Sequence, residues 1–218
     1  MKKHRQLLAL LICLVMSVSL LTGYSETKAA TEEPAQSGEQ ETAETREITD
    51  MSGRKVTVPA AENIESVFSA GPVAAIFLYM VAPDKLLGWN YELNDVEKSI
   101  ILDKYQDLPN FGMGDAVNYE AVIAANPTIA INSGKINDTM VSDCDALSES
   151  LGIPVVAVDN ELNNSAEAFR FMGELLGVED HAEEIAQYAE QVFTDINALS
   201  DIPEEKKVSV YFGNGEDS

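Results

Sequence analysis

Residues 126–158, NPTIAINSGKINDTMVSDCDALSESLGIPVVAV, decide the fold class of this 218-residue chain. Residues 128–132 and 153–158 are short apolar runs, and residues 143–151 between them have helical spacing and end before a glycine. Short apolar runs bounded by turn residues predict buried strands, and helices between such strands are typical of a parallel sheet. The stretch therefore predicts the middle of an α/β domain.

The same alternation continues on both sides of this stretch. Pro72 marks a helix start, because proline is favoured at the first helical position, whereas Pro127 and Gly177 mark helix ends. We expect a mostly parallel, Rossmann-like sheet with covering helices. The predicted strands are residues 64–69 and 86–89, and the predicted helices begin at residue 72 and cover residues 118–126 and 165–176.

The two ends of this α/β region have a different character. Residues 47–58 contain two alternating strands around an Asp-to-Gly turn, which predicts a β-hairpin. Residues 179–200 repeat apolar side chains at spacings of three and four, which predicts one long amphipathic helix. Residues 208–212 then read as a new strand without neighbours. We therefore expect the chain to end one strand into a second unit, over residues 207–218.

Residues 1–25 have the pattern of a secretory signal peptide. A basic start is followed by an uncharged apolar run over residues 7–21, which is shorter than the ~20 residues of a membrane span. Leu21-Thr22-Gly23 resembles the segment before the lipid-modified cysteine of bacterial lipoproteins, but Tyr24 occupies the cysteine position. Export is therefore expected, and both a lipid anchor and ordinary cleavage remain open.

Residues 26–45 and the overall charge describe an acidic exported protein. Residues 26–45 hold almost no large apolar side chain, so we expect a disordered acidic linker. The net charge of −23 argues against nucleic acid as a partner and against anionic lipid heads, since both require clustered Lys and Arg. Cys144 is the single cysteine after the signal, so no internal disulfide is expected, and a buried apolar role is favoured.

Several phrases resemble the class III solute-binding proteins of ABC importers, which include iron-siderophore and cobalamin receptors. In chain order these phrases are DMSGRKVTVP at 50–59, APDKLLGW at 82–89, LPNFG at 108–112, NYE at 118–120, ANPTIAI at 125–131 and LGIPVV at 151–156.

The resemblance implies two lobes joined by the long helix, with the ligand held between them. It implies residues 46–178 as the N-terminal ligand-binding lobe and residues 179–200 as the inter-lobe helix, with the second lobe missing. An ABC permease and its ATPase are the implied partners. The implied ligand is a small-molecule metal chelate such as a ferric siderophore, haem or a cobalamin-like molecule, with no intrinsic cofactor. Without a second lobe, we expect no tight binding by this chain alone.

Ligands of open α/β sheets bind at the carboxyl ends of the strands. Trp89 ends a predicted strand, and Asn90 and Tyr91 follow it. Trp89 and Tyr91 can pack on an apolar ligand face, although a core role for Trp89 is an equal alternative. The candidate ligand-binding residues are Ser69, Gly71, Pro72, Trp89, Tyr91, Gly114, Asp115, Asn132, Lys135 and Asp159.

Glu120 has a separate candidate role. It lies in the first turn of the predicted helix at residues 118–126. The resemblance places there the glutamate that docks an arginine of the membrane permease. A carboxylate in a first helical turn is also favoured by the helix dipole by roughly 0.3–1 kcal/mol, which requires no partner. Both interpretations remain open.

Metal-binding and catalytic motifs are scarce. His4 lies in the signal and His181 at the start of the long helix, so a direct metal site is not expected. Gly112-Met113-Gly114 lacks the third glycine of a dinucleotide fingerprint, and no Gly-x-Ser-x-Gly elbow is present, so we expect no enzyme. The alternatives to transport are an extracellular sensory or adhesive module and an inactive fragment.

The scarcity of basic residues near the candidate loops bears on the ligand. Lys135 is the main base there. This favours a neutral or cationic complex, or a second lobe that supplies the basic groups.

Overall fold

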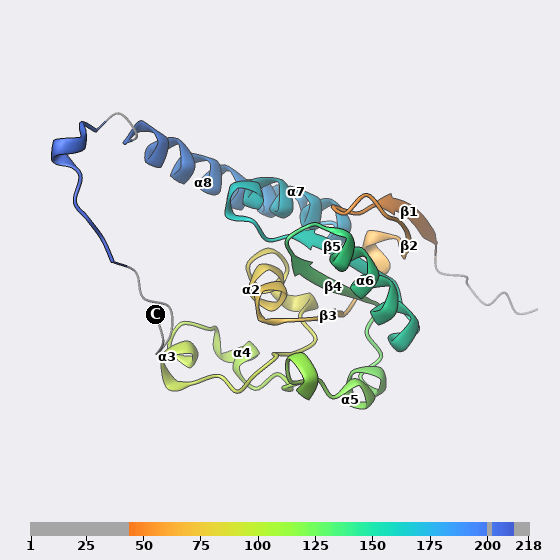
Figure 1. The fold of residues 1–218 in the computed structure, drawn as a ribbon. Helices are drawn as coiled ribbons and strands as arrows, with labels where there is room; N and C mark the ends of the chain where they lie inside the picture. Colours follow the sequence, from red (N-terminus) through yellow and green to blue (C-terminus); the bar gives the residue numbers. More distant parts are fainter. Residues whose placement is uncertain (1–43, 200–201, 212–218) are drawn as a thin grey trace, which may run out of the picture. The chain divides into compact units, whose positions relative to one another are not determined.

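The computed structural model describes residues 44–199 and 202–211 (Figure 1). The predicted signal and residues 26–43 of the predicted linker lie outside this part. The strands are β1 Thr45–Thr49, β2 Lys55–Pro59, β3 Val67–Ser69, β4 Ile129–Gly134 and β5 Val155–Asp159. The α-helices are α2 Pro72–Val81, α3 Asp95–Lys98, α4 Asp103–Gln106, α5 Tyr119–Ala124, α6 Asp138–Leu151, α7 Ser165–Leu176 and α8 Glu179–Ala198. Short 3-10 helices are η1 Ala61–Asn63, η2 Pro83–Lys85, η3 Gly114–Ala116, η4 Leu162–Asn164 and η5 Glu204–Lys206.

A parallel sheet lies at the centre, in the strand order β3-β4-β5. All five residues of β5 are buried, as expected for a strand in a sheet covered on both faces. Helices follow each strand, with α2 after β3, α6 after β4 and α7 after β5. The predicted α/β class with a mostly parallel sheet is therefore confirmed.

The alternation of side chains along the strands divides the core in two, because successive residues of a strand face opposite sides. Ile129 and Ile131 of β4 pack with residues of α2, α7 and α8, whereas Ala130 packs with residues of α5 and α6. Cys144 on α6 is fully buried in the second cluster, as predicted, and this burial raises the pKa of its thiol. The sheet is thus covered by helices on both faces.

The hairpin of β1 and β2 is antiparallel, as predicted, and its turn contacts the outer edge of β5, the last strand of the parallel sheet. Asp50 is buried, and its carboxylate accepts hydrogen bonds from the backbone nitrogens of Ser52, Arg54 and Ala157 at 3.0–3.1 Å. The nitrogen of Met51 donates to the carbonyl of Ala157 at 3.3 Å. The turn therefore occupies backbone groups that an edge strand otherwise leaves unpaired.

Side-chain caps set helix starts that periodicity alone does not show. Helix α6 begins five residues before the predicted start, because the Asn137 side chain accepts a hydrogen bond from the nitrogen of Met140 at 2.9 Å. Asn118 caps α5 in the same way through Ala121 at 3.0 Å. The predicted limits of α7 are confirmed, and Gly177 closes it with a φ of 71°.

The predicted strand at residues 86–89 is wrong. The segment is extended, but it makes only isolated bridges, from Leu86 to Val67 of β3 and from Trp89 to Asn110. Its backbone bonds alternate between two sides, since Leu87 donates to Val67 and Trp89 donates to Pro109. Neither side gains a continuous ladder, so the segment extends the sheet without becoming a regular strand.

Helices α7 and α8 pack closely along the first half of α8. A Cβ on Gly173 of α7 would overlap the Cβ of Ala182 on α8, so only glycine permits this approach. Arg170 of α7 donates to Glu183 at 2.6 and 3.0 Å and to Glu190 at 2.5 and 3.1 Å. Two carboxylates of α8 that lie about two turns apart are therefore held to one side chain of α7.

The second half of α8 and the residues after it have fewer neighbours. The predicted apolar stripe is confirmed at its start, where Ala182 is buried and Ile185 and Ala189 are half-buried, but Ile196 and Leu199 are 53% and 59% exposed. The predicted strand at residues 208–212 is wrong over its described part, because residues 208–211 form no ladder and Val208 is 83% exposed. Phe212 lies outside the described residues. A strand requires a paired neighbour, and the described chain supplies none here.

Candidate ligand site at the carboxyl edge of the sheet

The three parallel strands end at the same side of the sheet. Ser69 pairs with Ile131 in register, and Gly134 pairs with Asp159. We call the segments that follow or adjoin these ends the carboxyl-edge loops: residues 70–71, 90–94, 112–118, 135–137 and 160–164. In this type of sheet the edge is the usual place for a ligand.

Asn90 joins three of the segments at this edge. It is 1% exposed, and its Nδ2 donates to the carbonyls of Ser69 at 3.0 Å and Gly112 at 3.3 Å. Its Oδ1 accepts from the hydroxyl of Ser69 at 3.2 Å. One buried amide therefore connects the end of β3 to loops 90–94 and 112–118. The sequence placed Asn90 in a candidate loop, but its burial depends on contacts with residues more than 20 positions away, which periodicity does not show.

Trp89 belongs to the core, which was the alternative that the sequence left open. Only 4% of it is exposed, and its Nε1 donates to the carbonyl of Tyr105 at 2.8 Å. Its ring centroid lies 5.7 Å from that of Tyr79. Because the ring is buried and its N–H group is bound inside the protein, little of Trp89 is left for a ligand.

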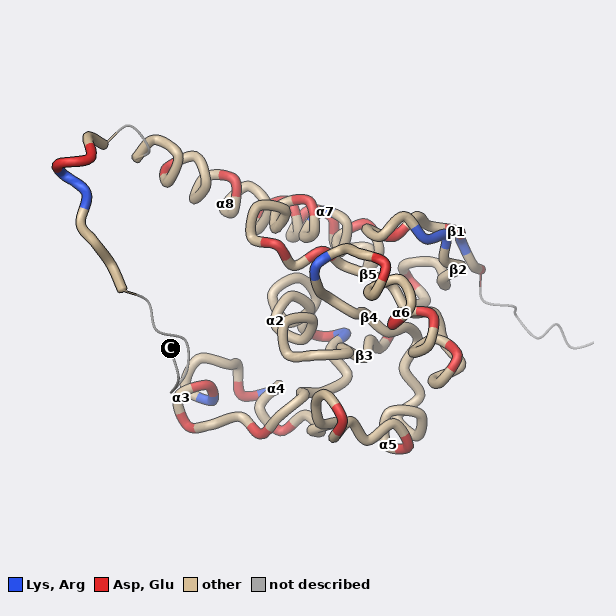
Figure 2. Tube along the Cα trace, in the orientation of Figure 1, with Lys and Arg blue, Asp and Glu red and all other residues tan. Residues whose placement is uncertain are grey.

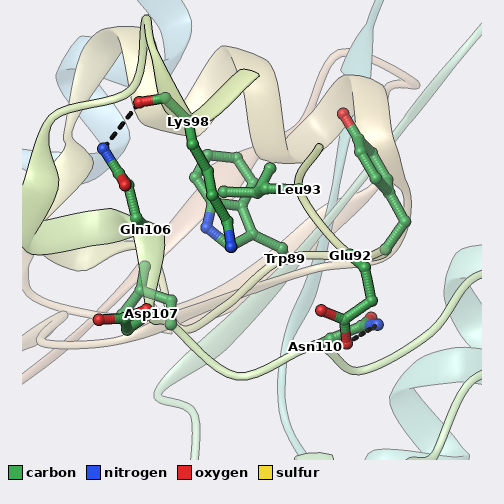
Figure 3. Close-up of a pocket in the computed structure, with 9 residues that line it drawn as sticks. Trp89, Glu92, Leu93, Lys98, Gln106, Asp107 and Asn110 are labelled. Carbon is green, nitrogen blue, oxygen red and sulfur yellow. Dashed lines mark hydrogen bonds between the residues drawn. The ribbon is translucent and has the colours of Figure 1, made fainter. Parts of the chain in front are cut away.

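Tyr91 is partly exposed and lines a cavity of about 220 Å³ with Trp89. The Tyr91 hydroxyl donates to Glu97 at 2.9 Å, and burial together with this carboxylate raises the pKa of the phenol. Figure 3 shows the cavity, with dashed bonds from Gln106 to the Lys98 carbonyl and from Asn110 to Glu92. The remaining lining residues are Leu93, Asp107 and Leu108.

A second cavity, of about 380 Å³, includes the candidate residue Asn132. It is lined by residues from β4, α5 and α6 and from the loop after β3: Ala70, Tyr119, Asn132, Asp143, Ala146, Leu147 and Ser150. Tyr119 is 43% exposed there, and it was not among the residues predicted from the sequence. Its position beside Glu120 in a helix start was visible, but its exposure depends on how α5 packs.

Asp159 and Lys135 lie at the ends of β5 and β4 and are bound to protein groups. Asp159 accepts from the nitrogen of Glu161 at 2.9 Å and from the side chain of Asn164 at 2.6 Å. Lys135 Nζ lies 3.4 Å from Glu161, and its side chain is 71% exposed. Both residues therefore help to order loop 160–164.

The remaining candidate ligand-binding residues lie in chain segments at the carboxyl edge of the sheet. Gly71 is the residue before α2, and Pro72 is its first residue, as predicted. Gly114 begins η3 with a φ of 57°, and Asp115 follows it on the exposed surface. The structure thus bonds Ser69 to Asn90, and Gly71 and Pro72 follow Ser69 in the chain. Gly114 and Asp115 come just after Gly112, which also bonds to Asn90.

Glu120 lies in the first turn of α5, as predicted, and it is exposed. No described part of the protein forms a hydrogen bond with its side chain. The docking role inferred from the resemblance thus concerns a surface carboxylate that is accessible in the described chain.

His181 and the acidic side chains carry the chemical groups that bind metal ions in proteins. His181 contacts the carbonyl of Met80 through Nε2 at 3.0 Å, and Glu184 lies 3.9 Å from its Nδ1. Within residues 44–199 and 202–211, no three His, Cys, Asp or Glu side chains gather into a group able to hold a metal ion. In the same residues, no helix combines the length and hydropathy needed to cross a membrane.

Comparison with known proteins identifies the family. The family model described as "Periplasmic binding protein" matches residues 74–218, so the chain belongs to this family of solute-binding proteins. A search of curated proteins found no match.

Solved structures share the fold. An ABC transporter solute-binding protein from Sulfurospirillum deleyianum aligns with a TM-score of 0.63 and 23% identity, over 74% of this chain and 51% of that one. The TroA-like periplasmic binding protein FepB from Veillonella parvula gives 0.53 and 26%, over 72% and 50%. The triscatecholate siderophore-binding protein FeuA from Bacillus subtilis gives 0.54 and 16%, over 73% and 53%. The chain thus spans about half the length of these proteins.

Proposed function

We propose that this chain is the N-terminal lobe of an exported receptor that captures a metal chelate and delivers it to an ABC permease. The observation that carries the proposal is the carboxyl edge, where buried Asn90 holds three segments together in a member of the periplasmic binding protein family. Loops fixed in this way provide a preformed wall for a ligand, which lowers the entropy cost of binding.

The class of ligand is proposed from the structural neighbours. FeuA is described as complexed with ferri-bacillibactin, and another neighbour is described as the haem-binding protein HmuT. Both ligands are bulky chelates whose metal is already coordinated. Such a ligand requires no metal site from the protein, so the proposed ligand is a ferric siderophore, haem or a cobalamin-like molecule.

The organisation of the chain follows from this proposal. Residues 1–25 act as the export signal and residues 26–45 as a linker, and residues 46–178 form the ligand-binding lobe. Residues 179–200 lead to a second lobe, which begins within residues 207–218. The exposed Ile196 and Leu199 support this arrangement, because a second lobe would cover apolar surface that is otherwise in water.

The proposed function is tested by titrating the full-length receptor with ferric siderophores, haem and cobalamin. We expect one of these chelates to bind with a Kd of about 1 μM or lower, and the lobe of residues 44–199 alone to bind it far more weakly, since it forms one wall of the site. Isothermal calorimetry measures the Kd of the full-length receptor and that of the lobe. No binding of any chelate by the full-length receptor contradicts the proposal.

Docking through Glu120 is tested separately by Glu120→Ala in the full-length receptor. We expect uptake of labelled chelate to fall while its Kd stays unchanged, because Glu120 is exposed and belongs to neither cavity lining. Glu149→Ala, at an exposed carboxylate on α6, is the matched control and should leave uptake unaltered. A loss of chelate affinity in Glu120→Ala would contradict the docking role.

A further inference from the structure

The described arginines are bound to acceptors of the protein itself. An arginine that binds an anionic ligand offers its planar fork of N–H groups to the ligand oxygens. Here each guanidinium already binds acceptors within the lobe, although the buried Nε of Arg46 has no hydrogen-bond partner among the described residues. The partners are the carbonyls of Glu174 and Leu175 at the end of α7 for Arg46, Asp50 and Asp145 for Arg54, and Glu183 and Glu190 for Arg170.

The lysines add little positive charge at the candidate site. Lys135 is the one lysine in the carboxyl-edge loops, and it lies 3.4 Å from Glu161. Lys98 lines the cavity of Figure 3, but two carboxylates, Glu92 and Asp107, line the same cavity. Neither ammonium group therefore leaves a local excess of positive charge.

The edge itself carries an excess of carboxylates. The carboxyl-edge loops contain Glu92, Asp115 and Glu161 against Lys135, and Asp159 adds a further carboxylate at the end of β5. In Figure 2, acidic positions outnumber basic ones over the described chain. The net charge of the whole sequence, −23, has the same sign, so the long-range field also repels anions and attracts cations.

We propose that this receptor selects a neutral or cationic metal chelate and discriminates against anionic ones such as ferric tricatecholates. The inference rests on the proposed function, because it assumes that the ligand contacts the carboxyl-edge loops. An anionic chelate approaching this wall meets carboxylates and finds no arginine in the carboxyl-edge loops. A neutral or cationic ferric trihydroxamate meets no such repulsion, and its amide oxygens accept hydrogen bonds from neutral groups.

The test compares three probes on the full-length receptor: a cationic ferric trihydroxamate, a neutral ferric trihydroxamate and a trianionic ferric tricatecholate. We expect either trihydroxamate to bind at least about tenfold more tightly than the tricatecholate. The difference between the cationic and anionic probes should narrow as salt rises, because mobile ions screen the field of the exposed carboxylates.

Charge reversal at the edge sharpens the test. Glu92→Lys and Asp115→Lys, both at exposed positions, should strengthen binding of the tricatecholate and weaken binding of the cationic probe. Glu174→Lys makes the same charge change at the end of α7, away from the edge. It should change the affinity for neither the tricatecholate nor the cationic probe by more than about twofold. Tightest binding of the tricatecholate overturns this inference and leaves the proposed function intact. If neither these probes nor any other chelate binds, the inference and the proposed function are both wrong.

Discussion

Two buried polar side chains, Asp50 and Asn90, connect distant segments of this lobe, but their structural roles differ. Asp50 joins the hairpin turn to β5 and is 3% exposed, and Asn90 joins β3 to two carboxyl-edge loops and is 1% exposed. The Asp50 carboxylate lies 3.0 Å from the guanidinium of Arg54, whereas Asn90 is a neutral amide. The comparison indicates that a charged connection secures the fold and a neutral one shapes the candidate site.

The largest effect is expected for Asp50→Ala. The substitution removes one of the two carboxylates that bind Arg54 and leaves the backbone nitrogens of Ser52, Arg54 and Ala157 without this acceptor. Breaking a buried ion pair costs about 3–5 kcal/mol. Urea denaturation followed by circular dichroism measures the free energy of unfolding. Asp145→Ala, which removes only the 65% exposed partner of Arg54, should cost less than about 1 kcal/mol. Equal costs for the two variants would break the comparison.

An intermediate effect is expected for Asn90→Ala. The carbonyls of Ser69 and Gly112 lose a donor in a buried place, which costs about 1–3 kcal/mol of stability. Because Trp89 is the adjacent residue and the single tryptophan, its emission should shift to the red in the folded state as the loop loosens. Ser69→Ala removes only the hydrogen bond from the Ser69 hydroxyl to Asn90 and should shift the emission less. Unchanged emission and affinity in Asn90→Ala would remove Asn90 from the candidate site.

The smallest loss of stability is expected for Arg170→Met. This variant tests whether the burial of a polar side chain or the number of its hydrogen bonds determines the loss of folding free energy. Arg170 makes four hydrogen bonds to carboxylates, but its side chain is 40% exposed, so water replaces much of what is lost.

The pH dependence of Arg170→Met has a defined sign. The Arg170 guanidinium lowers the pKa of Glu183 to about 2 and also lowers that of Glu190. A carboxylate with a lowered folded-state pKa stabilises the fold above its unfolded pKa, near 4.5, and this stabilisation is lost as pH falls toward 2. The Tm difference between wild type and Arg170→Met should therefore shrink between pH 5 and about pH 2. A difference that grows on acidification would contradict the pairing.

The sequence predicted the elements whose evidence is local. The turn of the hairpin, Pro72 at the start of α2 and Gly177 at the end of α7 all depend on the conformational preferences of a few adjacent residues. The class of sheet followed from the alternation of strands and helices. The prediction was wrong at residues 86–89 and 208–211, where apolar strand-like runs form no regular ladder. A ladder depends on a neighbouring backbone, which a local pattern does not contain.

For the candidate site, the sequence determined which loops meet, because parallel strands bring their carboxyl ends to one edge. It did not determine which side chains face a ligand. Trp89 turned inward to Tyr105, Asn90 became the buried connection, and Tyr119 remained exposed at a cavity. Local chain preferences determined the hairpin turn, the start of α2 and the end of α7. Only tertiary packing decided burial and the partner of each polar group, because both depend on residues far apart in the chain.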